Sequence, residues 1–222
     1  MQIKEEIMVV EELIKKVRIT MDENSSSSRL AEIKDIDSLQ LDELIRESIV
    51  AGVKYVHANA DVTELTDDVT EDAKLSSVEE KMIGSEKYIQ YIECPSDFHV
   101  LSSIKMSRWK KPVRILSVLN NVTEDMELCP YYGIGSDIES PAVYLTERKG
   151  KRVFMACSCD EEGSSLETFR YLPLPSIKEG NISIIKGRED DCAYAIAYNV
   201  FMSLGDTSMA SAMAEKIKMS NQ

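Results

Sequence analysis

The spacing of apolar residues changes twice along this chain, and those changes limit the folds it can adopt. Near the N-terminus, apolar residues from Val10 to Val17 and from Leu41 to Val56 follow the helical period. Between Lys87 and Gly187, short segments such as FHVLSSIKM and AVYLTER alternate with period two, which predicts strands. The segment EDDCAYAIAYNVFMSL, which begins at Glu189, opens with acids and is then apolar nearly all round, as is typical of a buried helix. The helices at the two ends can share one core only if the strands between them form an insertion.

We therefore predict an α+β fold, with a helical bundle formed by the N- and C-terminal helices and an inserted antiparallel β-domain. The bundle would comprise residues 1–80 and 188–222, and the β-rich domain residues 81–187, with about six strands in a sheet or small barrel. Residues 57–80 carry eight acidic side chains and one lysine, which indicates an acidic linker or a weakly held surface helix. Lys149 and Gly150 are expected to form the turn of a hairpin.

Small residues and capping residues predict how the helices pack and where they end. Gly52 lies on the apolar face of its helix and would let another backbone approach closely. Ala193 and Ala197, four residues apart, predict tight packing of a later helix. Gly205 would end that helix, and one of the residues 206–208 would cap the last one.

The last helix places methionines on one apolar face. Met209, Met213 and Ile217 share this face, and methionine adapts well to irregular partner surfaces. We predict that these three residues dock on a partner. The alternative is that they pack within their own subunit.

Charge and cysteine content limit the possible classes of function. The chain has 39 acidic and 26 basic residues, a net charge of -13, which argues against a general nucleic-acid binder. Five scattered cysteines argue against a disulfide scaffold and predict free thiols that are mostly buried, with metal or redox use as the alternative. We expect no membrane span and no secretory signal at the N-terminus.

No motif in the sequence indicates catalysis. The segment YYGIGSD (131–137) lacks the third glycine of a nucleotide loop, and the acids at 67–72 lack a calcium-loop pattern. The expectation is therefore a protein that is not an enzyme, with no catalytic residue, cofactor or metal.

One basic segment stands out in this acidic chain. It surrounds the single tryptophan, and its interface candidates are Lys105, Arg108, Trp109, Lys110, Lys111 and Arg114. Tryptophan and arginine are enriched in protein–protein contacts, so a contact with an acidic neighbouring subunit is one interpretation. The others are a solvated turn with Trp109 in the core, and a DNA contact.

Several stretches resemble the head-to-tail adaptor proteins of tailed bacteriophages. VVEELIKKVRITMDE and LQLDELIRESIVAGVKYV are similar to the opening helices of that family. ECPSDF, VLSSIKM and WKKPV (93–98, 100–106 and 109–113) are similar to its middle stretch in podovirus-like and crAss-like members. DDCAYAIAYNVFMSLGDTSMASAMAEKI resembles its late helix pair, so the resemblance covers most of the chain.

This resemblance implies a structural virion protein assembled in the host cytoplasm. It implies a twelve-fold homo-oligomeric connector ring in the neck that binds the portal protein and carries tail or neck proteins. DNA would pass through its channel without specific binding, and no membrane would be involved. The alternative is a cytosolic regulatory or nucleic-acid-associated module that uses the basic segment around Trp109.

Overall fold

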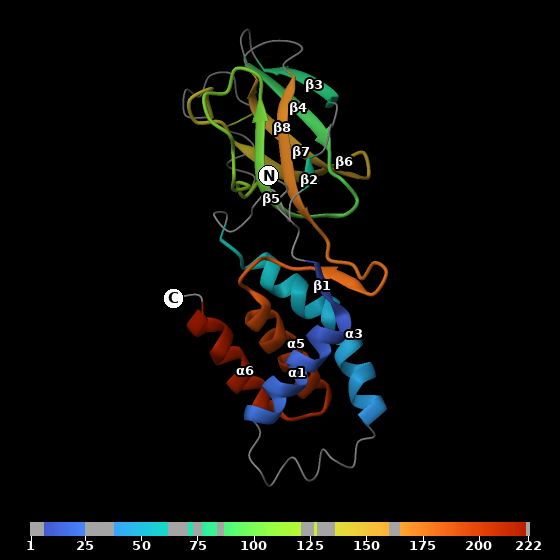
Figure 1. The fold of residues 1–222 in the computed structure, drawn as a ribbon. Helices are drawn as coiled ribbons and strands as arrows, with labels where there is room; N and C mark the ends of the chain where they lie inside the picture. Colours follow the sequence, from blue (N-terminus) through green and yellow to red (C-terminus); the bar gives the residue numbers. More distant parts are fainter. Residues whose placement is uncertain are drawn as a thin grey trace. The chain divides into compact units, whose positions relative to one another are not determined.

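The computed structural model describes residues 7–24, 38–61, 71–72, 77–83, 87–120, 127, 136–159 and 165–220. The chain forms two compact units: Met1–Val69 with Leu174–Gln222, and Thr70–Pro173. The first is called the helical unit and the second the β unit. The predicted α+β class is confirmed, because helices dominate the first and antiparallel strands the second (Figure 1). No helix among the described residues is both long and apolar enough to cross a membrane.

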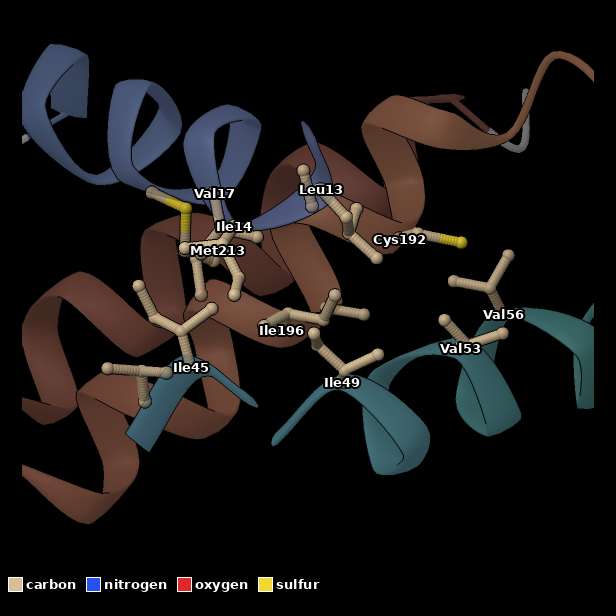
Figure 2. Packing of buried hydrophobic residues seen from close by; sticks show 14 of the residues in the cluster. Leu13, Ile14, Val17, Ile45, Ile49, Val53, Val56, Cys192, Ile196 and Met213 are labelled. Carbon is tan, nitrogen blue, oxygen red and sulfur yellow. The ribbon is translucent and has the colours of Figure 1, made fainter. Parts of the chain in front are cut away.

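The helical unit packs helices from both ends of the chain around one core. Its elements are β1 (Ile7–Val9), α1 (Val10–Asn24), α3 (Ser38–Ala58), β9 (Asn181–Ser183), α5 (Glu189–Ser203) and α6 (Thr207–Ser220). The apolar faces of α1, α3, α5 and α6 converge on this core, as Figure 2 shows. Leu13, Ile49 and Ile196 are completely buried there.

Glycine at position 52 allows α3 and α5 to approach closely, as the sequence predicted. A Cβ atom added at Gly52 would lie 2.9 Å from the backbone nitrogen of Ile196 and 2.6 Å from its Cγ1. Ala193 and Ala197 are also fully buried on α5. Small side chains on both helices therefore set the distance between them.

The link between α5 and α6 is a tightly defined turn. Gly205 has φ 79°, and the N–H groups of Gly205 and Asp206 donate to the carbonyls of Met202 and Phe201 at 3.2 and 2.9 Å. This is the paired bonding of a Schellman cap. The Asp206 carboxylate then accepts a hydrogen bond from the Met209 N–H at 3.1 Å and caps α6. The predicted glycine stop and the predicted cap are both present.

The strand Asn181–Ser183 lies in a different place from the one predicted. We expected it in the β-rich domain 81–187, but β9 pairs antiparallel with β1, with Met8 opposite Ile182. Residues 174–187 consequently belong to the helical unit. A short alternating segment shows that a strand forms, but its sequence does not identify the partner strand.

The β unit contains two antiparallel sheets. One has the order β2 (Glu71–Asp72), β8 (Leu166–Pro173), β5 (Phe98–Met106). The other has the order β3 (Ser77–Ile83), β4 (Lys87–Glu93), β7 (Lys151–Cys159), β6 (Val143–Arg148). The β6–β7 turn is the predicted hairpin: Lys149 and Gly150 both have positive φ, at 52° and 77°, which gives a type I′ turn.

Part of the predicted acidic linker is strand. Within residues 57–80, β2 pairs with β8, and β3 begins at Ser77 and pairs with β4. Both β2 and β3 are the outermost strands in their sheets. Edge strands tolerate charged residues, which block pairing with other chains, so an acidic edge strand resembles a linker in sequence. Residues 62–70 and 73–76 of that segment lie outside the described part.

Candidate interaction surface

Trp109 ends a tight turn that follows β5. The backbone N–H of Trp109 donates to the Met106 carbonyl at 3.2 Å, and Arg108 within the turn has φ 72°. The indole is only 2% exposed and packs in a cluster with Phe98, Phe154 and other core residues. Trp109 therefore belongs to the core of the β unit and is not an interface residue. This is the interpretation in which the turn is solvated and the tryptophan is internal.

The chain after Trp109 runs along two sheet edges. Val113 and Ile104 of β5 exchange a pair of backbone hydrogen bonds, both 2.8 Å long. Ser117 then donates its N–H to the carbonyl of Val143 in β6, also at 2.8 Å. One segment thus forms a bridge with an edge strand of each sheet, β5 in one and β6 in the other. Because its backbone is held on both sides of Arg114, the Cα positions between these points are fixed.

This segment presents charged and apolar side chains to solvent. Lys110, Lys111 and Arg114 are exposed, and Ile115 and Val118 are exposed to 74% and 79%. We call these five residues the basic strip. The structure shows no ion pair between the three cations and any residue in its described part.

Two other cations of the predicted site differ from the strip. Lys105, on β5, forms an ion pair with Glu167 of the adjacent β8 and is only 30% exposed. Arg108 is exposed, and its left-handed backbone forms the turn. The predicted basic segment is therefore divided. Lys105 forms an ion pair within its sheet, whereas Lys110, Lys111 and Arg114 lie exposed beyond the turn.

The predicted docking face on the last helix is internal. Met213 and Ile217 are 0% and 6% exposed and lie in the core of the helical unit, and Met209 packs against that core. Figure 2 shows Met213 among residues of α1 and α3. An amphipathic helix needs a core for its apolar face, and α6 finds one in its own subunit. This is the alternative that the sequence left open, and it corrects the predicted partner contact.

A buried carboxylate was not foreseen. Glu127 is 4% exposed and accepts hydrogen bonds from the Ser136 N–H and Oγ at 3.1 and 2.8 Å, and from the Tyr144 hydroxyl at 3.2 Å. Burial, together with the negative charge of Glu127, raises the pKa of Tyr144 far above its usual range. Nothing in the spacing of these residues signals the contact.

The described thiols are structural. Cys94, Cys157 and Cys192 are free and buried, as predicted for these three. Burial raises the pKa of Cys94, and it raises the pKa of Cys192 to about 12, which keeps both sulfurs protonated and unreactive. Cys129 and the side chain of Cys159 lie outside the described residues, as does most of the YYGIGSD segment.

A scan against protein-family profiles finds no matching family, and a search of curated protein sequences finds no similar protein.

Proposed function

We propose that this chain is a structural protein of the head-to-tail connector of a tailed bacteriophage. In this proposal it self-associates into a ring, binds the portal, and links the capsid to tail or neck proteins. The resemblance of its helices and middle stretch to adaptor proteins supports the phage assignment. The observation that carries the self-association is the basic strip.

The strip has the composition of a protein contact. Ile115 and Val118 are among the most exposed large apolar side chains of the described residues, and they lie beside three exposed cations. The rest of the protein is acidic, with a net charge of -13 for the whole chain. A basic, apolar strip on an acidic protein favours binding to an acidic protein surface, and further copies of the same chain supply many such surfaces.

Burial of Trp109 weakens the nucleic-acid alternative. Binding of single-stranded nucleic acid usually combines cations with exposed aromatic rings on which bases stack. The indole is 2% exposed, so it offers no such platform. The strip has three cations, and the β unit as a whole carries 17 acidic and 13 basic residues, which opposes binding to phosphates.

The proposal is tested by mass measurement of the purified chain, alone and mixed with portal rings of a podovirus-like or crAss-like phage. A closed ring of fixed subunit number that joins the portal is the expected result. A lasting monomer that ignores the portal would overturn the proposal. Binding to single-stranded DNA with a steep salt dependence would overturn it in favour of the nucleic-acid module.

A further inference from the structure

The helical unit has one acidic face whose carboxylates are not paired within the described chain. Glu43 and Glu47 of α3 are exposed, and neither forms an ion pair with a described residue. They are four residues apart, so they lie on the same side of the helix, where like charges repel and destabilise it. Val50, three residues beyond Glu47, is 36% exposed and adds an apolar side chain to that face.

This arrangement differs from the other flank of the helices. Glu11 pairs with Arg46 at 2.6 Å, and Asp42 pairs with Arg18 at 2.7 Å, across α1 and α3. On that flank, Glu11 and Asp42 each form an ion pair with an arginine. The face formed by Glu43, Glu47 and Val50, here called the α3 face, points away from the buried Ile45 and Ile49, and neither of its carboxylates forms an ion pair with a cation of the described residues.

The α3 face and the basic strip complement each other. One presents two carboxylates and an apolar side chain, and the other presents three cations and two apolar side chains. The helical unit has 22 acidic and 13 basic residues, so its wider field also attracts a basic segment. The strip is held to the sheet edges by backbone hydrogen bonds, so it reaches a partner without having to become ordered first.

We infer that the basic strip of one copy binds the α3 face of a second copy. Lys110, Lys111 and Arg114 meet the carboxylates of Glu43 and Glu47, and Ile115 and Val118 cover Val50. The two surfaces are different, so the contact is head-to-tail, and its repetition generates a closed ring or a filament. This inference rests on the proposed function, since it names the contact that would build the ring.

The test exchanges the charges of the two surfaces. The variant K111E/R114E makes the strip acidic, and E43K/E47K makes the α3 face basic. Each variant alone should associate with itself at least about 30-fold more weakly than the natural chain in sedimentation equilibrium. An equimolar mixture should recover to within about threefold, because every strip then meets a face of opposite charge.

A matched control for the strip variant K111E/R114E has the same change in net charge elsewhere. Lys178 and Lys186 are exposed in the helical unit, and K178E/K186E should associate as the natural chain does. Circular dichroism of each variant checks that it is folded. A second measurement mixes isotopically heavy and light chains, joins amines to carboxylates with a zero-length cross-linker, and seeks Lys110 or Lys111 joined to Glu43 or Glu47 between chains.

The outcomes separate this inference from the proposed function. Self-association that both reversals leave unchanged overturns the inference and leaves the ring protein standing. Cross-links confined to single chains also overturn the inference. A chain that stays monomeric but binds the portal overturns the inference and the ring of the proposed function, and leaves its portal binding standing. A chain that neither self-associates nor binds the portal overturns the proposed function as a whole.

Discussion

Replacing Gly52 with alanine tests whether the α3–α5 contact depends on the absence of a side chain. Two effects oppose each other. Alanine favours a helix over glycine by about 1 kcal/mol, which would stabilise α3. The new Cβ, however, would lie 2.6 Å from Cγ1 of Ile196, 2.9 Å from its backbone nitrogen and 3.1 Å from its Cα.

The steric effect should dominate. Carbon atoms in contact normally lie about 3.5–4.0 Å apart, so the predicted distances are too short. The Cγ1 atom can move by a change of rotamer, but the nitrogen and Cα move only if α5 shifts. We take about 3 kcal/mol for this overpacking, the upper end of its usual range. The net loss is then about 2 kcal/mol, which for a unit of this size lowers the melting temperature by about 8 °C.

The assay is denaturation followed by helical ellipticity, with the fluorescence of the single tryptophan, Trp109, reporting the β unit separately. Ala51, the exposed neighbour of Gly52, supplies the control, because A51G measures helix propensity with no packing change. We expect A51G to cost about 1 kcal/mol and G52A about 2 kcal/mol. If helix propensity alone decided the outcome, G52A would raise the free energy of unfolding by about as much as A51G lowers it. A G52A chain as stable as the natural one would refute the packing argument.

Two further predictions concern buried side chains. Burial raises the pKa of Cys192 to about 12, so as pH rises its thiol ionises in the unfolded chain before it ionises in the folded one. The contribution of the protonated thiol to the free energy of unfolding is therefore complete below about pH 9 and is lost as pH rises toward 12. Urea titrations should show the natural chain losing about 1.4 kcal/mol more than C192A between pH 8 and pH 10, and equal losses would contradict this. M213K buries an unpaired charge at a position with 0% exposure and should cost more than about 4 kcal/mol in urea denaturation, while M202K, at 47% exposure, should stay within about 0.5 kcal/mol of the natural chain. A folded M213K chain of normal stability would show that α6 does not use this face for its core.

The sequence predicts the helical core well because its information is local. Periodic apolar residues, a glycine on an apolar face and a glycine after the last helical turn each specify a packing or a backbone geometry directly. Gly52, Gly205 and the hairpin at Gly150 were foreseen for this reason. The partner of β9 and the strands in the acidic segment were not, because strand pairing depends on residues that are distant in sequence.

The basic strip shows a different limit of sequence reasoning. Ile115 and Leu116 are adjacent and chemically alike, yet Ile115 is 74% exposed and Leu116 packs against a core cluster. Val118 and Leu119 divide in the same way. Alternation assigns neighbours to opposite sides of an extended segment, but it does not say which side is covered. Only the hydrogen bonds from Val113 and Ser117 to the two sheet edges decide that.

The net charge of the chain determines which experiment can identify the strip's partner. Two copies, each with a net charge of -13, repel one another over distances comparable with the Debye length, about 8 Å at physiological ionic strength. Salt weakens this repulsion and also the local attraction between the strip and a carboxylate surface, so a salt titration changes two opposing terms at once. Reversing charges on one surface and then on the other alters the local term in a known direction. Recovery in the mixture of the two variants therefore identifies the contact, because the average net charge in the mixture stays that of the natural chain.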